Sequence, residues 1–297
     1  MDERRLEVFT AVARELNFSR AALSLHLSQS AVSQQIAALE AELGGELFDR
    51  SRRRVRLTPA GAALLERANR LLSDFAEARR AVAAARGAVE GELRVVSSRT
   101  IGTYVLPRLL AALGRRHPAL RLGIAIENSE RVMQSLLAGQ ADVGYVEDLV
   151  PTAGIVLTEL LRDELVVVAA SSHRFAQMPE ITVEDLAAEP LVVRESGSGT
   201  RRVSEEHLRA AGVRVQELRI AAELAGIEAT KAAVESGLGV AILSHVTLAK
   251  ELALGTLIVR RLTDVPIRRS FYAATLTRAT ELPAARELTA ALRGSRD

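Results

Sequence analysis

Uncharged hydrogen-bonding side chains cluster at the start of a predicted helix that covers residues 29–43. They are the hydroxyl and amide groups of Ser28, Gln29, Ser30, Ser33 and Gln34, with Ser28 at the expected N-cap position. Such groups donate and accept hydrogen bonds, as do the base edges in the major groove of DNA. These five residues are therefore predicted to bind DNA, with Gln29, Ser33 and Gln34 facing base edges, although a solvated face of a surface helix would show the same pattern.

Arginines are concentrated in the stretch that follows this helix. The densest positive patch of the chain contains Arg50, Arg52, Arg53 and Arg54. A run of charge alone is usually a solvated surface. Directly after a pair of short helices, however, it predicts a β-hairpin, or wing, whose arginines contact phosphates or the minor groove.

A third group of polar residues lies where predicted strands give way to helices. Hydroxyl groups, bare backbone N–H groups and a cation at such junctions suit a small anion. The predicted ligand-binding set is Ser98, Arg99, Thr100, Asn128, Glu147, Ser198, Gly199, Thr200 and Glu223. Helix capping alone would explain any one junction, and Arg99 is expected to pair either with the ligand or with Glu127 or Glu147.

Three short helices are expected to position the base-reading residues. The predicted buried stripe of the third helix is Val32, Ile36, Leu39 and Leu43. A helix capped by Ser19 precedes it, and a first helix over residues 4–16 packs against the pair through Leu6, Phe9, Val12, Ala13 and Leu16. Gly44 and Gly45 end the third helix, since glycine accepts the left-handed conformation required there.

A long helix begins at Pro59, with Thr58 as its N-cap, and is predicted to reach Arg86. Its apolar residues recur at heptad spacing: Leu64, Ala68, Leu71, Phe75, Ala78 and Val82. We expect this seam to pack against the same helix of a second copy, because a dimer presents two reading helices to a two-fold symmetric site. The alternative is that the helix lies on its own domain.

From residue 91 onward, short apolar runs alternate with helical patterns, which predicts α/β sheets, two of them for this length. The expected domains are 1–58 for the three helices and wing, 59–90 for the long helix, and 91–297 for a two-lobed α/β domain. Within the last, lobe I is expected to hold 91–161 and 266–297, and lobe II 162–265. The crossings are expected near Arg162 and Val265.

The amino-acid composition excludes several types of site and function. The chain has no cysteine, which excludes disulfides, thiolate metal sites and cysteine nucleophiles. A net charge of +2 is too small to signal nucleic-acid binding on its own. We find neither a secretion signal nor a membrane-spanning run, and we expect a cytoplasmic protein, bound to the bacterial nucleoid when on DNA. The histidines are scattered without metal-ligand spacing, so neither a metal nor a cofactor is expected.

The segment from Phe9 to Gly61 resembles the LysR-type transcriptional regulators over their whole DNA-binding module. The resemblance is carried by Ala21-Ala22-Leu23, Ser28-Gln29-Ser30-Ala31-Val32-Ser33, Leu47-Phe48 and Leu57-Thr58-Pro59-Ala60-Gly61. Thr100-Ile101-Gly102 and the stretch from Glu195 to Arg201 are similar to the branch that regulates carbon dioxide fixation and cysteine metabolism. The resemblance implies a winged helix-turn-helix, a linker helix and an effector domain like periplasmic binding proteins. It also implies a homotetramer that binds promoter DNA, responds to a small metabolite and can contact RNA polymerase.

Other function classes leave part of the chain unused. An enzyme would need a catalytic constellation, and Gly197 and Gly199 lack the Lys-Ser/Thr of a phosphate loop. A solute receptor would need an export signal. A purely architectural DNA-binding protein would have no function for the two-lobed domain. We therefore expect a regulator, not an enzyme, whose promoter binding or DNA bending responds to a small anion.

Overall fold

The computed structural model describes residues 1–50, 55–85, 89–148, 151–277 and 282–294. The chain divides into two compact units, Met1–Ala88 with Ala138–Gln140, and Val89–Leu137 with Ala141–Asp297. Arg52, Arg53 and Arg54, the predicted tip of the wing, lie outside the described residues. No helix among the described residues combines the length and apolar character needed to cross a membrane.

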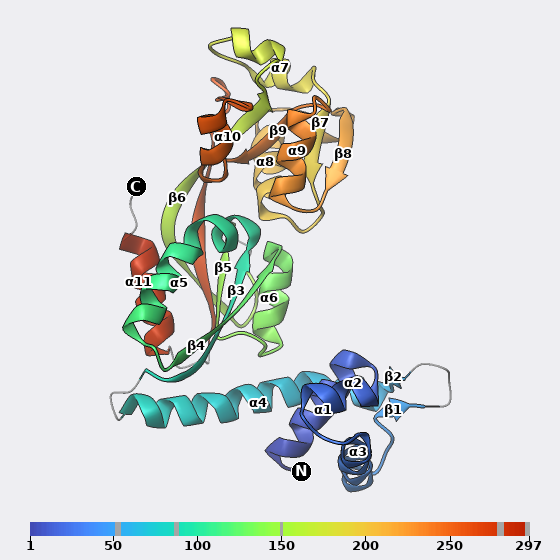
Figure 1. Cartoon of the computed structure of the whole chain (residues 1–297). Helices are drawn as coiled ribbons and strands as arrows, with labels where there is room; N and C mark the ends of the chain where they lie inside the picture. The colour runs from blue at the N-terminus through green and yellow to red at the C-terminus, as the bar shows by residue number, and fades with distance from the viewer. Residues whose placement is uncertain (51–54, 86–88, 149–150, 278–281, 295–297) are drawn as a thin grey trace. The chain divides into compact units, whose positions relative to one another are not determined.

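The first unit is a winged helix-turn-helix followed by a long helix, as predicted (Figure 1). Its elements are α1 (Glu3–Glu15), α2 (Phe18–Ser24), α3 (Gln29–Leu43), β1 (Phe48–Asp49), β2 (Arg56–Leu57) and α4 (Pro59–Ala85). The strands β1 and β2 pair antiparallel, with Phe48 opposite Leu57. Gly44 ends α3 in the left-handed conformation, with φ of 73°.

Two local predictions in this unit were wrong. Asn17, not Ser19, caps α2, because its side chain accepts a hydrogen bond from the Arg20 amide. Leu16 and Leu43 are exposed, although both were assigned to buried stripes. Each lies at the end of its helix, Leu16 as the left-handed cap of α1 and Leu43 as the last residue of α3, where the chain leaves the core.

The core of the first unit closes around aromatic side chains. Phe48 lies between Phe9 of α1 and Phe18 of α2, with ring centroids 5.4 and 5.7 Å apart, respectively. Val32, Ile36 and Leu39, three of the four predicted residues of the α3 stripe, are fully buried in the same cluster. This packing fixes the orientation of α3 and leaves its polar face in solvent.

The heptad seam of α4 is divided between two environments. Ala68 is fully buried in the core of the first unit, and Leu64 packs against the same cluster. Leu71, Phe75 and Val82 are 37, 43 and 56% exposed. The first two seam positions therefore pack on the chain's own helices, as the alternative interpretation held, and only the later positions leave an apolar surface free within one chain.

The second unit has an α/β architecture with two lobes, as predicted. Its helices and strands, in chain order, are β3 (Gly91–Ser98), η1 (Ile101–Val105), α5 (Leu106–Arg116), β4 (Leu120–Glu127), α6 (Ser129–Leu137), β5 (Val143–Val146), β6 (Ile155–Ala170), η2 (Arg174–Gln177), α7 (Val183–Ala187), β7 (Leu191–Arg194), α8 (Gly199–Ala210), η3 (Val215–Glu217), β8 (Ile220–Leu224), α9 (Ile227–Glu235), β9 (Ala241–Ser244), η4 (His245–Thr247), α10 (Ala249–Leu254), β10 (Leu257–Arg260), β11 (Ile267–Leu276) and α11 (Pro283–Gly294).

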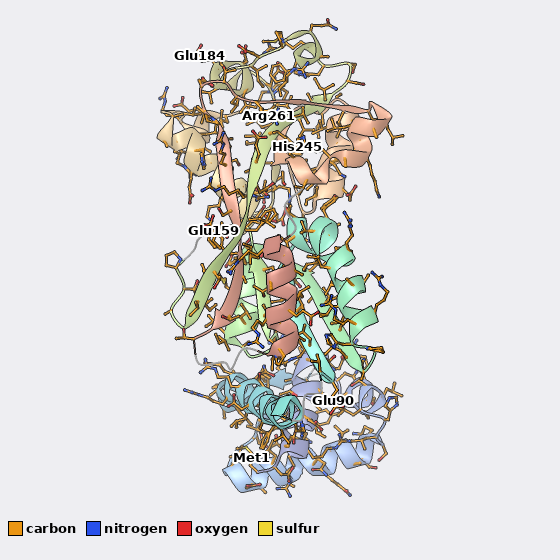
Figure 2. The ribbon with its side chains drawn as sticks, turned by 90° about the vertical axis from the view of Figure 1, so that its left-hand side faces the viewer. Met1, Glu90, Glu159, Glu184, His245 and Arg261 are labelled. Atoms are coloured by element: carbon orange, nitrogen blue, oxygen red, sulfur yellow. The ribbon has the colours of Figure 1, made fainter. Side chains whose placement is uncertain are left out.

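Two long strands, β6 and β11, connect the lobes (Figure 1). The strand order is β10-β6-β11-β5-β3-β4, with β9 also paired to β6 and a separate parallel pair of β7 and β8. Two apolar runs, 155–160 and 165–170, belong to the single strand β6. Its beginning pairs with β11, and its end pairs with β9 and β10. In Figure 2, Glu159 lies on the first part of β6, and His245 and Arg261 lie in the other lobe.

Alternating strand residues fill two cores in each lobe. In lobe I, Val95, Tyr145 and Ala273 face α5 and α11, whereas the next residue along each strand faces α6. In lobe II, Val167 and Ala169 face α7 and α8, whereas Val166 and Val168 of β6 face α9 and Leu248, the residue before α10. On β6 the core changes from that of lobe I at Leu160 to that of lobe II at Leu165. These layers place the carboxyl ends of β3 and β5 where the lobes meet.

Candidate functional site

The predicted base-reading residues lie together at the start of α3. Ser28 caps the helix by accepting a hydrogen bond from the Ala31 amide at 3.1 Å. Its hydroxyl also contacts that of Ser30 at 2.9 Å, and Gln29 Nε2 donates to Ser33 Oγ at 2.9 Å. Gln34 is exposed. These side chains form one uncharged surface, and hydrogen bonds between neighbouring side chains fix the orientation of several of them.

Arg50 has a structural environment at the base of the wing. Its guanidinium lies 4.7 Å from the centre of the Phe18 ring and 3.0 Å from Glu40 of α3. The other Glu40 oxygen accepts the Leu47 amide at 2.9 Å and the Phe48 amide at 3.3 Å. This arrangement ties the hairpin to α3 and the core. Sequence reasoning grouped Arg50 with the DNA-contacting arginines and did not anticipate these partners.

In the second unit, a buried ion network lies where β6 and β11 cross between the lobes. Arg269 of β11 pairs with Asp163 of β6 and with Glu147, which follows β5, at 2.7 Å in both cases. Ser244, at the end of β9 in lobe II, donates to Asp163 at 2.7 Å. All four residues are buried. The network therefore joins both lobes and both connecting strands at one guanidinium.

Glu147 belongs to the predicted effector set, and three further members of that set converge on this network. The Thr100 backbone amide donates to Glu147 Oε1 at 3.0 Å, and Thr200 Oγ1 donates to Glu147 Oε2 at 3.0 Å. Thr100 belongs to lobe I and Thr200 to the first turn of α8 in lobe II. Ser98 is buried at the end of β3, two residues before Thr100. The structure thus brings together the ends of β3 and β5 and the start of α8.

The charge states of the network follow from burial and pairing. Burial by itself would raise the pKa of Glu147, but the Arg269 charge and hydrogen-bond donors that include the Thr200 hydroxyl lower that pKa to about 2. Burial raises the pKa of Asp163 above its usual range despite Arg269 and Ser244. Glu147 is therefore an ionised carboxylate held between the lobes.

Arg99 joins the lobes through a partner that the sequence did not reveal. Its Nε lies 3.1 Å from Glu195 Oε1 in lobe II, and Arg194 contacts the other Glu195 oxygen at 2.9 Å. The expectation that Arg99 pairs with Glu127 or Glu147 was wrong, since Glu195 follows β7 and reaches across from the other lobe. Burial opposes ionisation of Glu195, but Arg194 and Arg99 outweigh it and lower its pKa.

The remaining predicted residues lie at the rim of the lobe boundary. Asn128 caps α6 by accepting the Arg131 amide at 2.9 Å, and Ser198 caps α8 through the Arg201 amide. Glu223 is exposed and pairs with Arg201 at 2.7 Å. Capping accounts for this contact of Ser198, as the alternative interpretation of these junctions held, whereas Asn128 Nδ2 also donates to the Ser196 carbonyl of lobe II at 3.5 Å.

Gly199 lies at a close contact between the lobes. A Cβ atom there would lie 2.7 Å from Ser129 Oγ and 2.9 Å from Asp148 Oδ2 of lobe I. Arg202 of α8 also pairs with Asp148. A groove of about 580 Å³ opens beside this contact, between α6 and α8, and its lining includes Met133, Ser198 and Arg201.

Tyr104 supplies another contact between the lobes. Its ring packs against the lobe II core that contains Ile227, and its hydroxyl donates to Glu228. Lys231, buried in α9, lies over the ring with Nζ 5.3 Å from its centre. Burial and the Glu228 hydrogen bond raise the pKa of Tyr104 to about 12, so the phenol stays a donor.

Sequence reasoning missed Arg269 and Asp163, although a signal was present. Arg269 alternates with Ile267 and Phe271 along β11, and all three are buried. Asp163 alternates with Leu165 on β6 in the same way. A charge at an apolar position of an alternating strand predicts a buried, paired group. No group of His, Asp or Glu within the described ranges is arranged to hold a metal ion.

Family models match both units of the chain. Residues 4–62 match the bacterial regulatory helix-turn-helix protein of the lysR family, and residues 86–296 match the LysR substrate binding domain. The chain belongs to the LysR family. It is a DNA-binding transcriptional regulator with an effector-binding domain, which confirms the resemblance carried by the motifs from Phe9 to Gly61.

Curated LysR-type relatives match most of the chain. The HTH-type transcriptional regulator CbbR of Rhodospirillum rubrum is 35% identical over 269 residues, covering 91% of this chain and 88% of its own. The HTH-type transcriptional regulator CysL of Bacillus subtilis is 36% identical over 247 residues, covering 83% of this chain and 82% of its own. The likeness to these two regulators agrees with the expected branch of the family.

Solved structures of LysR-type proteins share the fold. Full-length CbnR complexed with its target DNA has a TM-score of 0.72 at 28% identity and covers all of both chains. The regulatory domain of CcmR from Synechocystis PCC6803, in complex with 2-PG, has a TM-score of 0.63 at 27% identity. It covers 69% of this chain and 97% of its own.

Proposed function

We propose that this LysR-type regulator binds promoter DNA as an oligomer and that a small anion at the lobe boundary controls that binding. The protein acts by binding and conformational change, without catalysis. Its partners are double-stranded promoter DNA, the anionic effector, further copies of the chain and, at the promoter, RNA polymerase. This activity places the protein in the bacterial compartment that holds the DNA.

One observation carries the choice of an anion. Among the described atoms, the buried groups Arg269 Nη2, Thr100 Oγ1 and Ser98 Oγ have no hydrogen-bond partner. A buried guanidinium nitrogen without an acceptor lowers the stability of the folded protein. A hydrogen bond to an anionic oxygen would offset this desolvation penalty. All three groups belong to the surroundings of Glu147, where both lobes contribute donors. CcmR, whose regulatory domain has been solved with 2-PG, supplies a relative with a ligand in this kind of domain.

The free apolar surface of α4 supports an oligomer. Leu71, Phe75 and Val82 follow the heptad spacing and are exposed in the single chain. Burying such a seam against a second α4 removes apolar surface from water. The resulting dimer carries two copies of α3 for the two halves of a symmetric site, and pairing of dimers gives the tetramer expected for this family.

Anion screening by thermal shift tests the proposal. Sulfate, phosphate, acetate and small dicarboxylates are compared at constant ionic strength, with the wild type and with Thr100→Val. An effector anion raises the melting temperature of the wild type more than that of Thr100→Val and changes the gel shift of the chain's own upstream DNA. Equal stabilisation of both proteins, or stabilisation only by neutral aromatic compounds, contradicts the proposed effector class.

A further inference from the structure

Glu147 occupies the point where donors from both lobes converge. Its Oε1 accepts the amide of Thr100 from lobe I, and its Oε2 accepts the hydroxyl of Thr200 from lobe II. Arg269 Nη1 donates to the same Oε2 at 2.7 Å and to Thr200 Oγ1 at 3.0 Å. Thr100 and Thr200 belong to the set of residues predicted from the sequence to bind an anion, and Arg269 adds a donor that the sequence did not reveal.

We propose that Glu147 is an internal ligand of the effector-binding unit. Its carboxylate accepts hydrogen bonds from both lobes, as a bound anion would, and thereby holds the lobes together. We call the contact among Glu147, Thr100, Thr200 and Arg269 the carboxylate latch. It links a strand end of lobe I to a helix start of lobe II through charge-assisted hydrogen bonds.

The direction of the hydrogen bonds makes the latch depend on a negative charge. Thr200 has one hydroxyl proton, which it gives to Glu147, and its oxygen accepts from Arg269. The Thr100 amide and the Arg269 guanidinium can only donate. A neutral group at position 147 would leave these donors facing a weaker acceptor. An ionised carboxylate, from the protein or from solution, accepts from the Thr100 amide, the Thr200 hydroxyl and Arg269 Nη1.

A second contact shows that the closed arrangement is built into the chain. Gly199 lies one residue before Thr200, and its lack of a side chain lets α8 approach Ser129 and Asp148 of lobe I. Arg202, two residues after Thr200, pairs with that same Asp148. The first turn of α8 is therefore shaped to meet lobe I on both sides of the latch.

The latch changes how an effector would act, and this consequence rests on the proposed function. An anion that accepts from the Thr100 amide and the Thr200 hydroxyl must displace Glu147, so the internal carboxylate and such an effector are alternative occupants. Glu147 would then set the concentration at which an anion switches the regulator. The existence of the latch itself requires neither an effector nor DNA binding.

Chemical rescue tests the latch in the full-length chain. Glu147→Ala removes the carboxylate and leaves room for acetate, which restores the missing atoms. Since the chain has no cysteine, Ala112→Cys on α5 and Ala249→Cys on α10 give two exposed spin-label sites, one in each lobe. The distance between labels is measured by pulsed electron paramagnetic resonance, with unlabelled protein in excess so that distances within one chain dominate.

The expected result is a longer or broader distance distribution in Glu147→Ala and a melting temperature lower by about 10 °C. Acetate restores both, whereas acetamide and chloride at matched concentration do not. The control Glu287→Ala removes another lobe I glutamate, which pairs with Arg116 and His117 on α5 and the adjoining loop. Its label distances stay unchanged and insensitive to acetate.

If Glu147→Ala does not fold, Thr200→Val provides a second test of the proposal. It removes the lobe II donor while the pair of Glu147 and Arg269 remains, so the lobes separate and acetate has no effect. An unchanged distance in a folded Glu147→Ala or Thr200→Val variant overturns the proposal, as does equal rescue by acetamide. Thr100→Val keeps the backbone N–H that donates to Glu147. An anion screen in which this variant and the wild type respond equally would therefore contradict the proposed effector class without contradicting the latch.

Discussion

Gln34 is the side chain whose loss should separate base reading from backbone binding. It is exposed on α3, whose opposite face is fixed in the core by Val32 and Ile36. Gln34→Ala should weaken binding to the operator by about 1–3 kcal/mol and leave binding to random DNA nearly unchanged. Fluorescence anisotropy with both DNAs at one salt concentration measures the difference. Equal losses on the two DNAs would show that Gln34 does not read bases.

Glu147 should make the stability of the effector-binding unit depend on acid. Its pKa of about 2 in the folded protein lies below the ordinary value of 4.5. The folded state therefore binds fewer protons than the unfolded state, and the stabilisation is complete above about pH 4.5 and lost as the pH falls toward 2. Urea unfolding from about pH 5 to pH 3 should show a loss about 2 kcal/mol smaller in Glu147→Gln than in the wild type.

Asp148 and Asp163 provide the internal comparison for this experiment. Burial raises the pKa of each, so each gains protons at a higher pH than Glu147 does. Both remain in Glu147→Gln, but the negative charge of Glu147 also raises the pKa of each, so its removal lowers both pKa values and shifts their proton uptake to lower pH. If the pH dependence of the two proteins is the same, Glu147 is not the group that makes the folded state sensitive to acid.

At the scale of elements, the wing should contain arginines with two different roles. Arg50 stacks on Phe18 and pairs with Glu40, so Arg50→Ala should cost about 1 kcal/mol of unfolding free energy and leave the salt dependence of DNA binding unchanged. Arg52, Arg53 and Arg54 are predicted to contact phosphates or the minor groove. Replacing one with alanine should lower the slope of log K against log salt by about 0.9 for each phosphate that the arginine neutralises.

Salt titrations of the four single variants distinguish these roles. A reduced slope in Arg50→Ala would assign that residue to the DNA. An unchanged slope in all three of the other variants would mean that the wing arginines are only solvated.

At the scale of the whole molecule, the divided seam of α4 predicts which substitutions affect assembly. Leu71 is exposed in the single chain and should face the second copy, whereas Ala68 is buried in its own unit. Leu71→Asp should place a charge in the seam at a cost of several kcal/mol and shift the protein toward monomers. Ala68→Asp should instead unfold the first unit.

Light scattering and circular dichroism together separate the two outcomes. A native mass for Leu71→Asp would rule out this seam as the contact between copies. A folded monomer of Ala68→Asp would place that residue in the interface.

The sequence alone determined the local elements of the DNA-binding unit. Ser28, Gly44 and Thr58 mark helix ends through hydrogen bonds and backbone conformations that involve residues only three or four positions away. The spacing of apolar residues likewise predicted α3, α4 and the alternation of strands and helices. Such features depend on short-range geometry, which a single stretch of chain contains in full.

The tertiary structure alone decided how the charges of the second unit are paired. Glu147, Asp163 and Arg269 lie far apart in the chain and meet because β5, β6 and β11 are neighbours in one sheet. Tertiary packing also gave Arg99 its partner Glu195 in the second unit, and in the first unit it buried Ala68 while leaving Leu71 exposed. Capping and periodicity indicate that a residue is buried or polar, but the identity of its partner depends on which distant elements pack together, and that is settled only when the whole chain folds.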